Sequence, residues 1–184
     1  MTNIQNDRVL ILDFGSQYTQ LIARRVREIG VYCELLPFDV DVDYIKNFNP
    51  KGIILSGGPD TVTTDDSARA PKIIFDLDVP ILGICYGMQT MAMQLGGKAT
   101  SAEKHEYGFA KIRARNHSPL LSDIADEVND NGHGLLDVWM SHGIEVSELP
   151  VGFKRIASTD NCEIAGFANV EKHYYGLQFH PEVT

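Results

Sequence analysis

One cysteine stands in a pattern that could activate it as a nucleophile. Cys85 lies in the segment 83–87 (GICYG), which follows a short apolar run and leads into residues at helical spacing. A small-x-nucleophile-x-small sequence between a strand and a helix is typical of a nucleophile elbow, whose tight turn leaves no room for flanking Cβ atoms. Unpaired N–H groups and the helix dipole favour a thiolate at such a helix start. We therefore predict a nucleophilic Cys85, with the Tyr86 amide facing a developing oxyanion.

A base must accompany a functional cysteine, because most intracellular cysteines are only small buried hydrophobes. The best candidate is His180, which follows a strand pattern over residues 174–179 and precedes Pro181 and Glu182. We expect the imidazole to be neutral near pH 7, with the Glu182 carboxylate holding one tautomer. Taken alone, such a pair is more often a structural hydrogen bond. Together with the cysteine elbow, it favours acid–base chemistry.

Two further segments carry candidate polar groups. Segment 56–61 (SGGPDT) has some likeness to the phosphate loop of ATP pyrophosphatases, but Pro59 and the threonines that follow favour an irregular loop. The Gly58 amide is better explained as a second oxyanion donor facing Cys85 from the neighbouring strand. His142 precedes a glycine at an expected strand end, where it could line the pocket or cap the strand.

Composition excludes several functional classes. The chain has 184 residues, 43% of them hydrophobic, with a formal charge of −9, which suits one domain with a buried core. The acidic balance, without a Lys/Arg cluster, argues against binding to nucleic acid or an anionic membrane. Three cysteines at no metal-like spacing indicate a reduced, cytoplasmic protein. The first residues predict a strand and not a signal peptide, and no run is long enough to span a bilayer.

Apolar bursts alternate with amphipathic stretches in the first half of the chain. We expect strands over residues 8–14, 31–37, 51–56 and 81–84. We expect helices after a Ser16 cap, over residues 42–48 and 68–77, and after Cys85. This alternation predicts an α/β fold, with a mostly parallel central sheet and helices on both of its faces. Ligands bind such sheets beyond the carboxyl ends of the strands, where Gly58 and Cys85 both fall.

The pattern changes after Gly97. Residues 107–115 and 153–159 alternate as antiparallel strands do, and residues 164–169 do so more loosely. Segment 123–134 is rich in Asp, Asn and Gly, which predicts an exposed loop. We find no internal repeat and no domain boundary. The second half is expected to be a small antiparallel extension of one domain that spans residues 1–184.

The segments that carry these candidates resemble, in the same order and over the whole chain, the signatures of class I glutamine amidotransferases. They are 13–18 (DFGSQY), 56–59 (SGGP), 83–89 (GICYGMQ), 138–143 (VWMSHG) and 178–183 (QFHPEV). Within that class, the opening DFGSQYTQLIARRVRE and the VWMSHG block are most similar to the N-terminal glutaminase domain of the GMP synthetase family. The resemblance implies a flavodoxin-like core.

The resemblance also assigns roles to residues of this sequence. It implies a nucleophile at Cys85, a base at His180 and an orienting carboxylate at Glu182. It implies oxyanion donors at the amides of Gly58 and Tyr86. Contacts to the substrate glutamine would come from Gln89 and from the backbone of Ser141, His142, Gly143 and Ile144.

The implied reaction is hydrolysis of glutamine to glutamate and ammonia through a γ-glutamyl thioester, without a metal or cofactor in this domain. In a complete synthetase the ammonia would pass to an adenylated XMP on an ATP pyrophosphatase domain, giving GMP for purine biosynthesis. The resemblance therefore implies ATP and magnesium for that other domain, which could be fused or a separate subunit. It also implies a homodimeric full enzyme.

The chain departs from the family pattern at two places. Ile144 stands where the family usually has Asp after Ser-His-Gly, and the sequence ends at Thr184, where the family continues. We therefore expect a piece of a longer synthetase. The alternatives are a free-standing glutaminase subunit serving another synthase, a cysteine peptidase or γ-glutamyl hydrolase on a similar α/β core, and a non-catalytic regulatory module. Gln89 favours the glutaminase, because a pocket for a free amino acid needs fixed polar groups.

Overall fold

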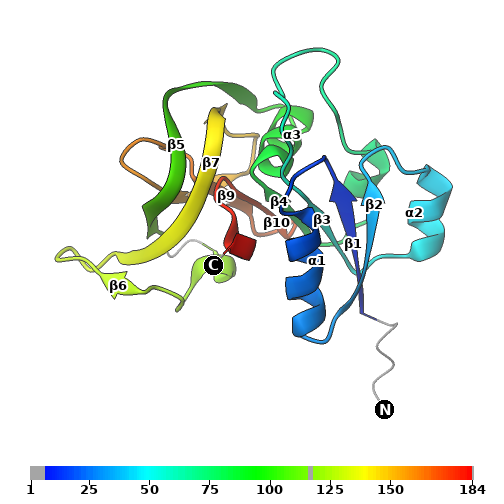
Figure 1. The fold of residues 1–184 in the computed structure, drawn as a ribbon, viewed down its shortest axis with the longest axis horizontal. Coiled ribbons are helices and arrows are strands. Elements are labelled where there is room, and N and C mark those ends of the chain that lie inside the picture. Colours follow the sequence, from blue (N-terminus) through cyan, green and yellow to red (C-terminus); the bar gives the residue numbers. More distant parts are fainter. Residues whose placement is uncertain (1–6, 116–117, 184) are drawn as a thin grey trace.

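A computed structural model describes residues 7–115 and 118–183 of the chain. The other residues, including Thr184, lie outside the described part. The described residues form a ten-stranded sheet in the order β2-β1-β3-β4-β10-β9-β8-β5-β7-β6, and helices pack against both of its faces (Figure 1). In these residues no helix is both long and apolar enough to cross a membrane.

The first five strands in this order run parallel to one another. They are β2 (Tyr32–Pro37), β1 (Arg8–Asp13), β3 (Gly52–Leu55), β4 (Ile81–Ile84) and β10 (Tyr174–Leu177). The chain moves outward from β1 in both directions, to β2 on one side and to β3 and β4 on the other. A crevice at the carboxyl ends of the strands is expected where the order reverses in this way.

The described chain contains three α-helices, which are α1 (Thr19–Glu28), α2 (Val42–Phe48) and α3 (Tyr86–Gln94). The first two connect parallel strands, and α3 follows β4 and leads into the antiparallel half. Successive side chains of a strand point to opposite faces of the sheet, and β1 distributes its apolar residues accordingly. Ile11 packs in one buried cluster with Ile22 of α1. Leu10 and Leu12 pack in another, which contains Met88 of α3 and residues of α2. The expected α/β fold with helices on both faces is confirmed.

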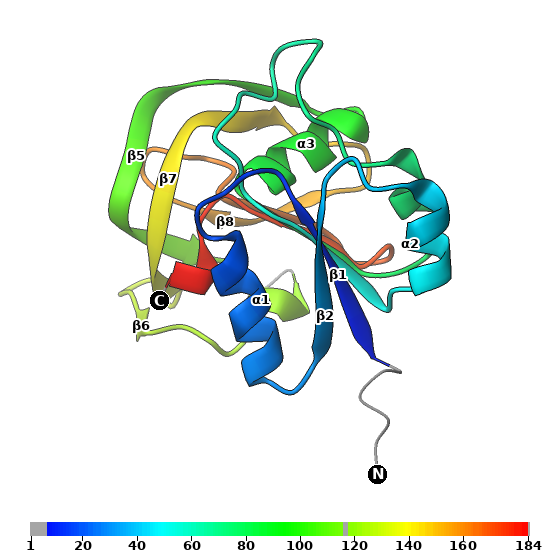
Figure 2. The same cartoon turned by 45° about the vertical axis from the view of Figure 1, so that its right-hand side comes forward.

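The remaining strands are antiparallel and continue the same sheet. They are β5 (Lys98–Ala114), β6 (Glu127–Val128), β7 (Gly134–Glu148), β8 (Lys154–Ser158) and β9 (Gly166–Asn169). The long strands β5 and β7 pair with each other and curve together beside α3 (Figure 2). A register shift between Ser101 and Glu106 interrupts that pairing. The expected antiparallel extension is therefore present, and it supplies one wall of the site.

The prediction of a helix over residues 68–77 is wrong. Only residues Lys72–Asp76 are helical, as a short 3₁₀ turn after Pro71. Side chains of α3 hold the preceding backbone: the Tyr86 hydroxyl donates to the Ala68 carbonyl at 2.8 Å, and Gln94 pairs with both backbone groups of Ala70. Backbone groups captured by side chains in this way are not free to form a helical turn.

Two smaller expectations also need correction. The first helix begins at Thr19 with Tyr18 as its N-cap, and no side chain caps it. Ser16 instead accepts a hydrogen bond from the Tyr18 amide at 3.0 Å, in a turn that precedes the helix. His142, which we placed at a strand end, lies within the long strand β7. The β5–β7 pair continues past His142, because the two strands pair again beyond the register shift.

Candidate active site

Cys85 occupies a strained turn between β4 and α3. Its backbone angles are φ 51° and ψ −107°, and it is the N-cap residue of the helix. A non-glycine residue with positive φ is uncommon, and such strain gathers at functional sites. The Cys85 amide donates to the Leu177 carbonyl of β10 at 2.7 Å, which anchors the turn to the neighbouring strand. The predicted elbow is present in the structure.

The two glycines that flank the elbow are required by close packing. A Cβ built on Gly83 would lie 2.6 Å from the Gly87 carbonyl oxygen, within the turn itself. A Cβ on Gly87 would lie 2.2 Å from the Leu55 carbonyl oxygen of β3. The first glycine therefore lets the turn close, and the second lets α3 approach the sheet.

His180 and Glu182 follow β10 and lie at the same edge of the sheet. The imidazole Nδ1 and the Glu182 Oε1 are 2.8 Å apart, with side chains only 4% and 2% exposed. The Tyr18 ring lies edge-on to the imidazole, with centroids 5.1 Å apart, and the His180 amide donates to the Trp139 carbonyl at 2.9 Å. These contacts fix the imidazole plane and leave its Nε2 directed away from the carboxylate.

The charge on His180 differs from the sequence expectation. Burial lowers the pKa of His180, but hydrogen bonds with Cys85 and Glu182 outweigh burial and raise this pKa to about 9. The imidazole is therefore protonated near pH 7, where we had expected it to be neutral. The expected neutral imidazole takes account only of the orienting effect of Glu182, whereas a nearby carboxylate also stabilises the positive charge on its partner.

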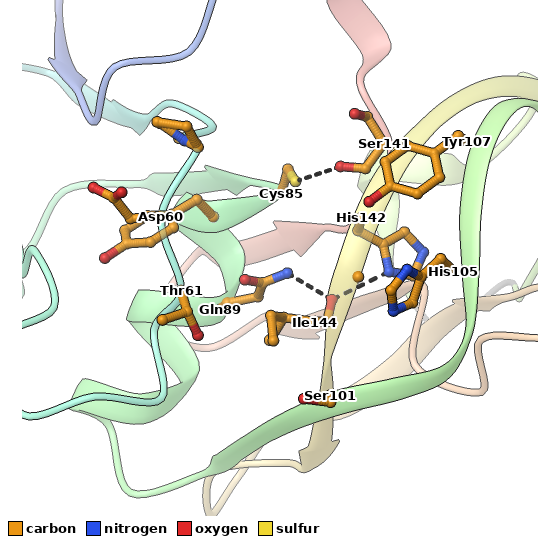
Figure 3. A pocket seen from close by; sticks show the side chains of 14 residues that line it. Asp60, Thr61, Cys85, Gln89, Ser101, His105, Tyr107, Ser141, His142 and Ile144 are labelled. Carbon is orange, nitrogen blue, oxygen red and sulfur yellow. Dashed lines mark hydrogen bonds between the residues drawn. The ribbon is translucent and has the colours of Figure 1, made fainter.

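Two other groups contact the sulfur of Cys85. The sulfur lies 3.5 Å from the Ser141 carbonyl oxygen, as Figure 3 shows, and the Gln178 side-chain amide nitrogen donates to the sulfur at 3.5 Å. Cys85 itself is 6% exposed. The sulfur is therefore placed by β7, by the end of β10 and by the imidazole of His180.

The sulfur lies between two cavities. The larger, of about 480 Å³, contains eight residues that the sequence predicted for the site: Gly58, Cys85, Tyr86, Gln89, Ser141, His142, Gly143 and Ile144. The smaller, of about 300 Å³, is lined by His180 and Tyr18, and both cavities share Gly58, Cys85 and Ser141. Tyr86 is the first residue of α3, so its amide has no partner within the helix. The volume of the larger cavity is in the range of small-molecule sites.

The wall of the larger cavity is built around one backbone oxygen. The Ile144 carbonyl accepts the Gln89 amide nitrogen at 2.8 Å and contacts His142 Nδ1 at 3.1 Å (Figure 3). Behind the histidine, Nε2 lies 3.3 Å from a carboxylate oxygen of Glu106. His142 therefore lines the pocket and supports its wall, which decides between the two roles that the sequence left open.

Sequence reasoning assigned no role to two residues of this arrangement. Gln178, which contacts the sulfur, appears in the sequence only as part of the segment 178–183. Its position two residues before His180 was the available signal, because alternate residues of an extended chain point the same way. Glu106, which contacts His142, gave no signal, because its position depends on the register shift in β5.

One cluster contains atoms of the kinds that bind metals. Glu106, His142 and Cys162 each offer a ligand atom, and these atoms lie within 4.8 Å of one another. The Glu106 carboxylate already accepts hydrogen bonds from Thr159 and Asn161, and burial, with nearby carboxylates, raises the pKa of the Cys162 thiol to about 12. A metal needs a thiolate. These contacts are better explained as hydrogen-bonded support for His142.

Comparison with known proteins assigns a family. Residues 10–184 match the family model described as glutamine amidotransferase class-I. The chain is 82% identical over its full length to a protein named GMP synthase [glutamine-hydrolyzing] from Ruthia magnifica, and 76% identical to one of the same name from Vesicomyosocius okutanii. It spans 34% of the length of each of these relatives.

Solved structures agree with the fold. A putative GMP synthase subunit from Thermoplasma acidophilum superposes with a TM-score of 0.81 at 28% identity, covering 96% of this chain and 84% of that protein. PurLQS from Thermotoga maritima superposes with a TM-score of 0.72 at 20% identity, covering 96% of this chain and 88% of that one. The second likeness concerns the fold alone.

Proposed function

The chain belongs to the class I glutamine amidotransferases, and on this premise we propose that it hydrolyses L-glutamine to glutamate and ammonia with Cys85 as nucleophile. The observation that carries the proposal is the convergence of Cys85, His180 and Glu182 where cavities of about 480 and 300 Å³ meet at the Cys85 sulfur. A sulfur, an imidazole and an orienting carboxylate in this order make up the nucleophile–base–orienter arrangement of covalent hydrolases.

In the first step the sulfur attacks the side-chain amide carbon of glutamine. The protonated imidazole of His180 stabilises negative charge on the sulfur before the attack. As the C–S bond forms, the amide C=O becomes an oxyanion, which the N–H groups of Gly58 and Tyr86 stabilise. His180 then gives its proton to the amide nitrogen, and the C–N bond breaks. Ammonia departs, and a γ-glutamyl thioester remains on Cys85.

In the second step water hydrolyses the thioester. His180, now neutral, accepts a proton from the attacking water, so that a C–O bond forms while the C–S bond breaks. Glutamate leaves with the new oxygen, and the imidazolium and the thiolate are restored. Glu182 keeps Nδ1 protonated and Nε2 facing the sulfur throughout. Each atom is accounted for without a metal or a cofactor.

The substrate binds along the wall that Gln89 and β7 provide. Gln89 and the backbone of Ser141, His142, Gly143 and Ile144 hold the α-amino and α-carboxylate groups of glutamine, while the carboxamide reaches Cys85. The side chain of Ile144 carries no charge, so that the polar contacts at this position are made by its backbone. This arrangement suits a free amino acid better than a peptide, because the polar groups line the same cavity and can hold both the α-amino and the α-carboxylate group.

The full reaction belongs to a protein longer than this chain. Relatives of about three times its length are named GMP synthase [glutamine-hydrolyzing]. We propose that the ammonia serves the amination of XMP to GMP on a synthetase domain that binds ATP and magnesium. That domain would be the partner of this one, fused or separate, in a cytoplasmic homodimer.

Active-site labelling tests the proposal. A glutamine-analogue alkylator, 6-diazo-5-oxo-norleucine, should label Cys85 and spare Cys33 and Cys162, which are also buried and unpaired. Glutamine should suppress the labelling and asparagine should not, and Cys85→Ser should abolish glutamate release. Labelling of Cys85 that glutamine does not suppress would overturn the proposal, and so would hydrolysis of γ-glutamyl peptides in preference to glutamine.

A further inference from the structure

We propose that Gln178 is a further catalytic residue, whose side-chain amide donates a hydrogen bond to the Cys85 sulfur and connects that sulfur to the glutamine-binding residue Gln89. The inference deepens the proposed function, because it assigns a second donor to the same nucleophile. Its evidence is a chain of three hydrogen bonds that runs from the pocket wall to the sulfur.

Gln178 is placed by the strand pair that also places the nucleophile. It follows β10 directly, and its backbone N–H donates to the Ala165 carbonyl at 2.9 Å. Its side chain is 0% exposed. Burying an amide is unfavourable unless its polar atoms are hydrogen-bonded, so a fully buried glutamine marks a position where those bonds matter. Both ends of this side chain are bonded, and both partners belong to the site.

The orientation of the Gln178 amide follows from a backbone group. The Ile144 carbonyl can only accept, so the Gln89 atom that it contacts at 2.8 Å must be the donating nitrogen, Nε2. That same nitrogen lies 3.1 Å from Gln178, which must therefore present its oxygen. The remaining atom of Gln178, the donating Nε2, is then the one that faces the Cys85 sulfur at 3.5 Å. The Ile144 carbonyl therefore sets the donor and acceptor in each of the three hydrogen bonds.

A neutral amide at this position does what a second histidine could not. It donates to the sulfur in both the thiol and the thiolate form, and it cannot take the proton that His180 must deliver. A hydrogen bond to a charged acceptor is roughly twice as strong as one between neutral groups, so this bond strengthens when the sulfur is ionised. The bond between Gln178 and Gln89 means that a ligand that moves Gln89 also changes the donor at the nucleophile.

The pH dependence of alkylation by iodoacetamide tests this inference without requiring glutamine turnover. Gln178→Met keeps the volume and removes the donor, and Gln178→Glu replaces the donor by a carboxylate. We expect the Cys85 alkylation rate at pH 6.5 to fall about tenfold in Gln178→Met, and further in Gln178→Glu, with the alkylation profile moving to higher pH. Thermal unfolding shows whether each variant is folded.

Gln94→Met is the matched control. Gln94 is also a glutamine with both amide atoms bonded, but its partners are the backbone groups of Ala70 and the Thr90 hydroxyl, and no hydrogen bond joins it to the sulfur. This variant should keep the wild-type alkylation profile. Folded Gln178 variants with the wild-type alkylation profile would overturn the inference. They would show that Gln178 has only a structural role and does not affect the reactivity of the Cys85 sulfur. That result would leave the glutaminase proposal intact, since its test is the labelling by a glutamine analogue.

Steady-state kinetics give a second readout. Gln178→Met should lower kcat about tenfold and change KM by less, because Gln89 keeps its bond to the Ile144 carbonyl. A rise in KM at unchanged kcat would place Gln178 in substrate binding only, and would also contradict the inference.

Discussion

Ile84 of β4 lies directly opposite Leu177 of β10 in parallel register. One residue beyond Ile84 the chain turns at Cys85, and three residues beyond Leu177 it reaches His180. Two segments that are far apart in the sequence are therefore joined at the active site by one strand pair. A shift of that register by one residue would turn Gln178 and His180 toward the opposite face.

The first prediction separates the base from the group that orients it. His180→Ala should lower kcat for glutamine by at least about a hundredfold, because proton transfer to the leaving ammonia is lost. Glu182→Gln should lower it by a smaller factor, since the imidazole remains beside the sulfur. Ammonia release under saturating glutamine measures both. Unchanged turnover in His180→Ala would refute the assignment of the base.

The second prediction concerns stability and pH. The pKa of His180 is raised from 6.5 to about 9, so the folded state holds this proton more tightly than the unfolded state. The resulting stabilisation is fully present below about pH 6.5 and disappears as the pH rises through 9, with an upper limit of about 3 kcal/mol. Urea unfolding at several pH values between 6 and 9.5 measures this loss. His180→Gln should flatten the dependence, and an equally steep profile in that variant would contradict this account.

The third prediction tests the support behind the pocket wall. Glu106→Ala removes the carboxylate next to His142, so that the histidine no longer holds the Ile144 carbonyl in place. We expect KM for glutamine to rise about tenfold while kcat changes less, which corresponds to lost ground-state binding. Glu103→Ala, an exposed neighbour on β5, is the control. Equal effects of the two substitutions would exclude a specific role for Glu106.

The fourth prediction tests the packing of the elbow. Gly87→Ala would place a Cβ 2.2 Å from the Leu55 carbonyl oxygen, which can move only with its strand. Overpacking of this kind destabilises by about 1–3 kcal/mol or more. Gly52→Ala is the control, because the nearest atom to its Cβ would be 3.8 Å away. Chemical denaturation of both variants provides the comparison, and equal midpoints would show that α3 has room to move.

The parts of the site that could be predicted from the sequence are those encoded locally. The glycines around Cys85 and the carboxylate next to His180 are within a few residues of the groups that they serve. The parallel half of the sheet was equally accessible, because strand and helix periods alternate there. These features need no knowledge of which distant residues meet.

The remaining parts depend on distant partners. The contact of Glu106 with His142 requires the pairing of β5 with β7 and the register shift that interrupts it. The expected helix over residues 68–77 failed because side chains of α3 hold Ala68 and Ala70. The charge of His180 depends on Cys85 and Glu182, which together outweigh the effect of burial on its pKa. The sequence shows the carboxylate next to His180, but it does not show how these opposing effects balance.

The backbone of Cys85, at φ 51° and ψ −107°, has a consequence beyond chemistry. A conformation of this kind costs a side-chain-bearing residue on the order of 1–3 kcal/mol, whereas glycine adopts it freely. Cys85→Gly should therefore be more resistant to heat than Cys85→Ala, although both lack the sulfur. The substitution that relieves the strain at this position also removes the proposed nucleophile. A screen for thermal tolerance alone would therefore accept the loss of that sulfur.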